Sequence, residues 1–227
     1  MSRPIIVFDL DGTLVDTAPD LLDSLKHILG IGGVADADVS GLRGYVGHGG
    51  RALIERAYAA HNTPLPAAEH DRLLALYLDH YGLNIPGKSQ PYPGVVVALD
   101  RFTEAGFLLA ICTNKAEAFS RKLILSLGLN HYFSAICGQD TFAFRKPDPR
   151  HLTETILKAG GDPRGAVMVG DSQTDIDTAK AAGIPVVAVD FGYTDLHVRE
   201  YDPSKVISHY DELTVELAEQ LIAVAER

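Results

Sequence analysis

Five short apolar runs recur along the chain, and the first lies far from the others. They cover residues 5–8, 107–112, 135–137, 166–169 and 186–189, and leucine and isoleucine at helical spacing separate the later runs. This alternation predicts right-handed parallel β-α-β units with helices on both faces of one sheet. A crossover between parallel strands needs a dozen or more residues, whereas roughly a hundred separate the first two runs. The chain therefore carries an insertion after its first strand.

The inserted segment contains helical patterns only. They cover residues 21–29, 52–60 and 73–81, and glycine and proline interrupt them; the Pro- and Gly-rich stretch 86–94 is typical of a hinge. We therefore predict an α/β protein with a Rossmann-like parallel sheet. Residues 1–17 and 89–227 form its core, and residues 18–88 form an all-helical cap.

Two acidic residues, Asp9 and Asp11, directly follow the first apolar run. In open α/β sheets ligands bind beyond the carboxyl ends of the strands, so these carboxylates suit a divalent metal or a nucleophile. A tight Asp-Gly hairpin turn is the alternative. The leucines that follow at helical spacing favour a strand–turn–helix instead.

A second acidic cluster follows the run 166–169. Asp171 and Asp175 are four positions apart, hence on one helical face, where like charges repel unless a cation compensates them. Helix capping is the alternative for both residues. Oxygen ligands from Asp9, Asp171 and the Asp11 backbone carbonyl suit Mg²⁺. Asp175 is expected to hold these ligands in place without binding the metal itself.

Polar residues also follow the run 107–112. Thr113 and Asn114 can donate hydrogen bonds to a phosphoryl group, and helix capping is the alternative for Thr113. We expect Lys146, which Pro147 and Pro149 restrain, to supply the fixed positive charge beside that group. Lys115 is assigned no role, since it can face solvent.

The stretch Asp9-Leu10-Asp11-Gly12-Thr13 resembles the first motif of the haloacid dehalogenase superfamily, Asp-x-Asp-Gly-Thr. Thr113, Lys146 and Asp171 follow in the order of that superfamily's later motifs. The resemblance implies a Mg²⁺-dependent phosphomonoester hydrolase in which Asp9 forms an aspartyl-phosphate and Asp11 acts as general acid and base. It implies the same three metal ligands. The stretch through Leu22 looks most like phosphoglycolate phosphatases, which makes 2-phosphoglycolate the leading substrate.

Other activities remain open. Within the superfamily these are a pyrophosphatase, a nucleotidase, a sugar-phosphate phosphatase and a β-phosphoglucomutase-like mutase, which keeps both aspartates. Dehalogenation is disfavoured because Asp11 suits protonation of a leaving group. Outside enzymes, a regulatory module phosphorylated on aspartate is the alternative, and the helical insertion argues against it.

The inserted segment includes a glycine-rich loop at residues 43–50. Neither a preceding strand nor a Gly-Lys-Ser/Thr ending supports a nucleotide-binding P-loop. We expect the loop to reach over the active site, with Arg43 or His48 binding a substrate carboxylate. A plain connection between helices is the alternative.

Composition limits the partners. A net charge of −10 argues against nucleic-acid binding, which needs clustered Lys and Arg. The N-terminal apolar run is too short for a signal-peptide core and no run has membrane length, so we expect a cytoplasmic protein acting on a small phosphorylated metabolite. Cys112 and Cys137 lie in separate apolar stretches and are expected to be buried free thiols. The sequence does not indicate an oligomeric state.

Overall fold

The computed structural model describes residues 3–34 and 37–225. Within these ranges the central sheet has six parallel strands in the order β5-β4-β1-β6-β7-β8. The predicted α/β fold is confirmed, and each of the five apolar runs forms a strand; β8 was not predicted. The strands are β1 (Ile5–Phe8), β4 (Leu108–Cys112), β5 (Ala135–Cys137), β6 (Ala166–Gly170), β7 (Val186–Val189) and β8 (Lys205–Ile207).

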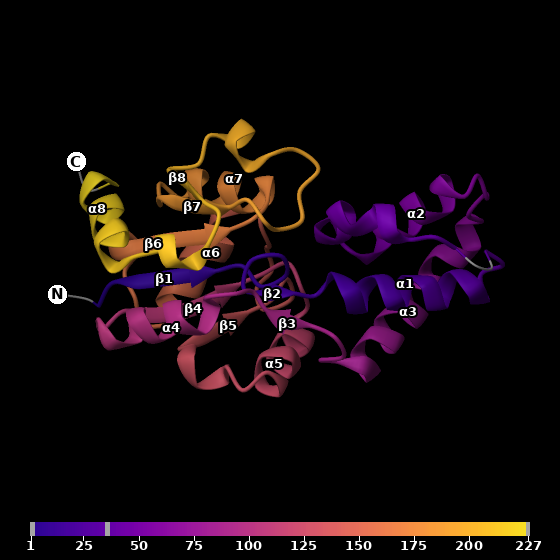
Figure 1. Cartoon of the computed structure of the whole chain (residues 1–227), viewed down its shortest axis with the longest axis horizontal. Helices are drawn as coiled ribbons and strands as arrows, with labels where there is room; N and C mark the ends of the chain where they lie inside the picture. Colours follow the sequence, from indigo (N-terminus) through magenta and orange to yellow (C-terminus); the bar gives the residue numbers. More distant parts are fainter. Residues whose placement is uncertain (1–2, 35–36, 226–227) are drawn as a thin grey trace.

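Strand β1 lies in the middle of the sheet and is buried on both faces. Its side chains alternate, so that Ile6 and Phe8 join one hydrophobic core while Ile5 and Val7 join the other. Helices α4, α5 and α8 contribute to the first core, and α6 and α7 contribute to the second (Figure 1). The helices are α4 (Val95–Glu104), α5 (Glu117–Ser126), α6 (Pro149–Lys158), α7 (Gln173–Ala181) and α8 (Val215–Ala225).

The strand register sets where the polar residues emerge. Phe8 pairs with Ile111 of β4 and with Val169 of β6, so these three parallel strands end nearly level. The residues that follow them therefore meet at one edge of the sheet. Short 3₁₀ segments complete this part of the chain: η3 (Asn130–Tyr132), η4 (Pro163–Gly165), η5 (Val198–Tyr201) and η6 (Tyr210–Glu212).

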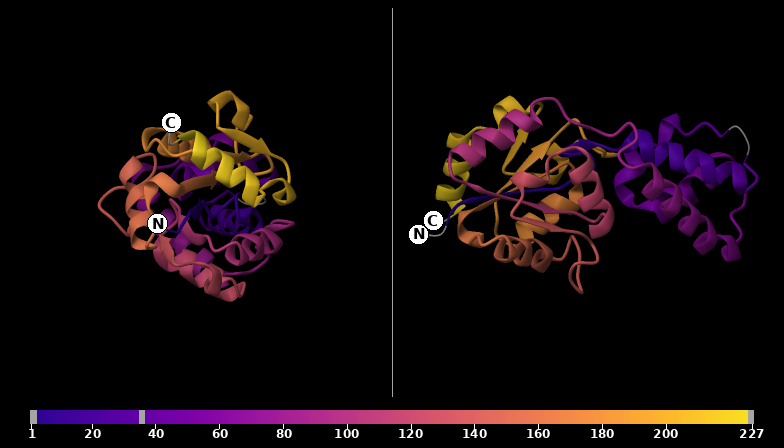
Figure 2. Two further views of the ribbon diagram at one scale, coloured as in Figure 1. Left: turned by 90° about the vertical axis from the view of Figure 1, so that its left-hand side faces the viewer. Right: turned by 90° about the horizontal axis from the view of Figure 1, so that it is seen from below.

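The inserted segment is helical, as predicted. Figures 1 and 2 show its helices at one end of the molecule and the sheet with both chain termini at the other. Helix α1 buries Leu21, Leu25, Ile28 and Leu29, a stripe at helical spacing. The elements are α1 (Ala18–Ile31), η1 (Ser40–His48), α2 (Gly50–Ala60), η2 (Ala67–Glu69) and α3 (His70–Asn84).

The two passages of chain between the sheet and the cap helices are bonded to each other. Strand β2 (Val15–Asp16) pairs antiparallel with β3 (Gln90–Pro91), so the predicted hinge stretch 86–94 contains a short strand. The buried Asp20 carboxylate also accepts hydrogen bonds from the Lys88 N–H (2.7 Å), the Ser89 N–H (2.8 Å) and the Ser89 hydroxyl (2.5 Å). The two linkers, residues 15–20 and 86–94, are therefore joined to each other by a short sheet and by the hydrogen bonds of Asp20.

Both cysteines lie in the sheet and are buried with free thiols, as predicted. Among the described residues, no helix is both long and apolar enough to cross a membrane.

Candidate active site

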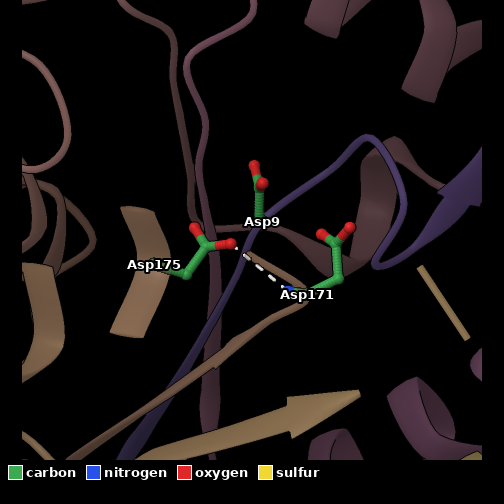
Figure 3. A group of neighbouring side chains, drawn as sticks. All are labelled: Asp9, Asp171 and Asp175. Carbon is green, nitrogen blue, oxygen red and sulfur yellow. Dashed lines mark hydrogen bonds between the residues drawn. The ribbon is translucent and has the colours of Figure 1, made fainter. Parts of the chain in front are cut away.

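Three aspartates gather at the carboxyl edge of the sheet. Asp9 follows β1, Asp171 follows β6, and Asp175 lies in the first turn of α7 (Figure 3). One carboxylate oxygen from each lies within 4.8 Å of the other two. The structure thus brings together three acidic residues that the sequence analysis selected from two separate motifs.

The Asp171 carboxylate is held by two donors. The Thr13 hydroxyl donates to Oδ1 (2.7 Å), and the Tyr193 backbone N–H donates to Oδ2 (2.7 Å). The backbone approaches so closely that a Cβ added at Gly12 or Gly192 would lie 2.3 or 2.2 Å from an Asp171 atom. Gly12 also has a φ of +81°, which favours glycine. The turn at Asp11-Gly12 therefore brings the backbone close against the Asp171 carboxylate, where only glycine fits.

Asp175 has both carboxylate oxygens engaged. Its Oδ1 accepts from the Lys146 ammonium (2.5 Å), and its Oδ2 accepts from the Asp171 N–H, the Ser172 N–H and the Ser172 hydroxyl. Ser172 in turn accepts from the Asp175 N–H and completes a capping box at the start of α7. Asp175 therefore caps helix α7 and at the same time holds Lys146 and the Asp171 backbone in place.

Lys146 is the cation within the cluster. Its side chain is 2% exposed, and its Nζ lies 3.0 Å from Asp9 Oδ1 and 2.5 Å from Asp175 Oδ1. Burial raises the pKa of Asp9 to about 6, with Lys146 opposing this change. Burial, reinforced by Asp175 and then Asp9, raises the pKa of Asp171 well above its usual value. Three carboxylates lie together here, and Lys146 pairs with only two of them, Asp9 and Asp175. The negative charge in excess and the all-oxygen donor set therefore fit a hard divalent cation.

Thr113 and Asn114 lie beside the loop that carries Lys146. The Asn114 amide donates from Nδ2 to the Lys146 carbonyl (2.9 Å), while its buried Oδ1 has no hydrogen-bond partner among the described residues. The buried Thr113 hydroxyl accepts from the Lys115 N–H (3.2 Å), which leaves its own proton available. Asn114 thus fastens the Lys146 loop to the end of β4.

The expectation that Lys115 can face solvent is wrong. Its side chain is 6% exposed, and its Nζ lies 3.0 Å from both carboxylate oxygens of Asp11. Thr17 donates a further hydrogen bond to Asp11 (2.8 Å). Lys115 also lies 4.3 Å from the ring centre of Tyr81, a residue of cap helix α3. Pairing with Asp11 offsets the cost of burying the lysine.

Arg43 lies at the contact between the cap and the core. Its guanidinium pairs with Asp16 (2.8 Å) and lies over the Tyr193 ring, 5.4 Å from its centre. The Tyr193 hydroxyl donates to Asp16 (2.5 Å) and accepts from the Ala18 N–H (2.8 Å). The charge of Arg43 is therefore already paired at the linker.

His48 faces a different part of the cap. Its ring meets Tyr45 edge to face, with 5.8 Å between ring centres. The two residues border a pocket of about 320 Å³ on the cap, whose other lining residues are Ala52, Glu55, Arg56 and Ala59. The acidic cluster contributes none of the lining residues of this pocket.

The amino-acid sequence matches a known family of enzymes. The family of haloacid dehalogenase-like hydrolases matches residues 6–189 of the chain. The chain belongs to this family. Three of the residues that carried the resemblance, Asp9, Lys146 and Asp171, lie in or against one buried acidic cluster of this hydrolase.

Several relatives of this haloacid dehalogenase-like hydrolase carry the name phosphoglycolate phosphatase. One from Mesorhizobium japonicum is 72% identical over 225 residues, which is 99% of each chain. One from Agrobacterium fabrum is 48% identical and covers 97% of this chain and 94% of its own. Among solved structures, a predicted phosphoglycolate phosphatase from Haemophilus somnus is 28% identical, with a TM-score of 0.85 over 94% of this chain and 97% of that one.

Two residues that shape the site of this hydrolase, Lys115 and Tyr193, were not predicted from the sequence. One feature of the sequence could have indicated the role of Lys115: it follows a strand that ends beside Asp11 at the same sheet edge. No sequence feature indicated the role of Tyr193. It contacts Asp171 through its backbone N–H, and its hydroxyl contacts Asp16 from a loop far along the chain.

Proposed function

We propose that the chain is a Mg²⁺-dependent phosphatase that hydrolyses 2-phosphoglycolate to glycolate and phosphate. The observation that carries the chemistry is Asp9 itself. Its carboxylate pairs with a buried lysine and lies near two further aspartates, and a fourth carboxylate, that of Asp11, follows two residues later. The substrate is inferred from the relative that is 72% identical over nearly the whole chain.

In this mechanism an Asp9 carboxylate oxygen attacks phosphorus and the ester P–O bond breaks. Protonated Asp11 gives its proton to the departing glycolate oxygen. Asp11 then takes a proton from the water that attacks the aspartyl-phosphate, and this step releases phosphate and restores Asp9. Asp11 lies 3.0 Å from Lys115 and 2.8 Å from Thr17, and these contacts hold it in place for both proton transfers.

Lys146 and Thr113 serve the phosphoryl group. The Lys146 ammonium, already 3.0 Å from the attacking carboxylate, offsets negative charge as the phosphoryl oxygens approach. The Thr113 hydroxyl donates to one of those oxygens. Asn114 acts through the hydrogen bond that fixes the Lys146 loop, and its remaining N–H is available to the phosphoryl group.

Mg²⁺ would be held by Asp9, Asp171 and the backbone carbonyl of Asp11. Asp175 would orient Asp171 by accepting a hydrogen bond from the Asp171 N–H. When bound, Mg²⁺ neutralises charge on the phosphoryl oxygens and on the carboxylates. The raised pKa values of Asp9 and Asp171 support this assignment, because a cation would relieve the crowding of buried negative charge.

We further propose that residues 18–88 select the substrate while residues 1–17 and 89–227 transfer the phosphoryl group. The closeness of η1 to the core supports this division. A Cβ added at Gly44 or Gly47 would lie 3.4 or 3.5 Å from the carbonyl oxygens of Thr194 and Tyr193. The cap thus borders the chain segment that contacts Asp171.

A panel of small phosphate esters, assayed with Mg²⁺ and with EDTA, tests the proposal. We expect 2-phosphoglycolate to give the highest kcat/KM and EDTA to abolish turnover until Mg²⁺ is restored. Asp9→Asn should lower turnover by orders of magnitude, and acid-quenched wild type, but not this variant, should carry a covalent phosphate by intact mass. A need for a bisphosphorylated activator would identify a mutase instead, and phosphorylation without turnover would identify a regulatory module.

A further inference from the structure

The proposed substrate has a second anionic group that needs a partner. In 2-phosphoglycolate one carbon separates the carboxylate from the ester oxygen. That oxygen leaves beside Asp11, so the carboxylate comes to lie just beyond Asp11, away from Asp9. A cation that binds it must therefore lie next to Asp11. This inference rests on the proposed function and specifies how the same site recognises the substrate.

Two buried lysines are available at the site, and they lie on different aspartates. Lys146 contacts Asp9 and Asp175, which places it on the phosphoryl side. Lys115 contacts both oxygens of Asp11 at 3.0 Å, which places it on the side of the leaving group. Arg43 pairs with Asp16 and not with Asp11, so it does not lie on the side of the leaving group. Lys115 is thus the cation in position for the carboxylate.

A second donor lies beside Lys115. Tyr81 is 2% exposed, and its buried hydroxyl, which interacts with the Lys115 ammonium, has no acceptor for its own proton among the described residues. Leaving a buried hydroxyl unpaired is costly, and native sites usually satisfy such groups. The Tyr81 ring is fixed edge to face against Phe119 of core helix α5, with 5.7 Å between ring centres, and lies under the Lys115 ammonium at 4.3 Å. The hydroxyl therefore has a fixed position and a free proton.

Asp11 is the more exposed member of its ion pair with Lys115. Its side chain is 19% exposed, whereas that of Lys115 is 6% exposed. Burial raises the pKa of Tyr81, which keeps the phenol neutral and able to donate. We propose that Lys115 from the core and Tyr81 from the cap together bind the substrate carboxylate. Specificity for a two-carbon acid then depends on one residue from each side of the cap–core boundary.

The test compares 2-phosphoglycolate with ethyl phosphate, which has the same chain length and lacks the carboxylate. Tyr81→Phe keeps the ring and removes only the hydroxyl. We expect it to lower the ratio of kcat/KM values, phosphoglycolate over ethyl phosphate, by about ten- to a hundredfold. Tyr92→Phe is the matched control, because the Tyr92 hydroxyl is also buried and unpaired among the described residues; it should leave the ratio unchanged.

Binding without turnover gives a second readout. In the Asp9→Asn background, calorimetry should give a Kd for each ester with Mg²⁺ present. Adding Tyr81→Phe or Lys115→Gln should weaken phosphoglycolate more than ethyl phosphate, again by about tenfold or more. This measurement separates loss of carboxylate binding from displacement of Asp11, which would change kcat for both esters.

Three results would overturn the inference. The first is a Tyr81→Phe protein in which the kcat/KM ratio and the Kd ratio of the two esters both stay unchanged. Equal loss of activity on both esters leaves the ratios unchanged too and would indicate a packing role for the hydroxyl. The second is a ratio that falls in Arg43→Gln but not in Tyr81→Phe, which would assign the carboxylate to the cap loop. The third is wild-type protein that hydrolyses ethyl phosphate as well as phosphoglycolate, which would refute the proposed substrate and the carboxylate site with it.

Discussion

Asp171→Asn should make the metal-free protein more stable while abolishing its response to Mg²⁺. Asp171 is buried, and one of its oxygens lies within 4.8 Å of oxygens from both Asp9 and Asp175. At that separation two unit charges repel by about 3.5 kcal/mol with an effective dielectric constant of 20. Relaxation and water penetration reduce this repulsion, so removing the charge should stabilise the metal-free fold by about 1–3 kcal/mol.

The amide can keep the local hydrogen bonds. The substituted side chain would accept from the Tyr193 N–H through Oδ1 and donate from Nδ2 to the Thr13 hydroxyl, which can rotate to accept. For a chain of this length the gain corresponds to a Tm about 2–10 °C higher in EDTA. Wild type should gain about 2.7 kcal/mol at free Mg²⁺ a hundredfold above its Kd, and the variant should gain almost nothing.

Thermal unfolding at pH 7.5, with EDTA and with Mg²⁺, measures both effects. Asp148→Asn is the control, because hydrogen bonds from Arg150 lower the pKa of Asp148 to about 2 and its charge is therefore favourable. This change should not raise the Tm and should preserve the response to Mg²⁺. An Asp171→Asn protein that melts below wild type in EDTA, or that Mg²⁺ still stabilises, would refute the electrostatic reasoning.

Three further changes test other parts of the structure. Gly12→Ala should cost about 1–3 kcal/mol and most of the activity, since its φ is +81° and the new Cβ would meet Asp171 at 2.3 Å; unaltered urea unfolding would contradict this. Asp20→Ala should cost about 2–4 kcal/mol by unpairing the part-buried N–H of Lys88 and the buried N–H of Ser89, and a urea midpoint close to that of wild type would exclude it. Burial, reinforced by Lys146, lowers the pKa of His151 from 6.5 to about 4. The fold therefore favours neutral His151, and this contribution to the unfolding free energy is complete above pH 6.5. It falls by about 3 kcal/mol as the pH drops towards 4. His151→Asn should remove that part of the pH dependence of the unfolding free energy, and an identical pH profile would count against it.

The central strands were predictable because a parallel sheet covered on both faces needs continuous apolar runs. Strand β1 at Ile5–Phe8 is such a run. Strand β8 was not found, since it lies at the sheet edge, has three residues and begins with an exposed lysine. Strands β2 and β3, of two residues each, have no periodic pattern of their own. Their pairing arises only when the two linkers meet.

The acidic cluster was predictable for a related reason. Once Asp9 and Asp171 are placed after parallel strands, the sheet itself brings them to one edge. The burial of Lys115 was not predictable, because a lysine taken alone is usually exposed. It depends on Asp11 and on Tyr81, which arrives from the cap. Contacts made across the cap–core boundary follow from tertiary packing, which local residue patterns do not encode.

The pairing of the two linkers has a thermodynamic consequence for ligand binding. A cap attached by two independent flexible chains would lose much rotational freedom each time it settled over a ligand, and that loss would weaken binding. Strands β2 and β3, with Asp20 bonded to Lys88 and Ser89, remove most of that freedom when the protein folds. Part of the entropic cost of organising the active site is therefore met during folding, before any substrate arrives.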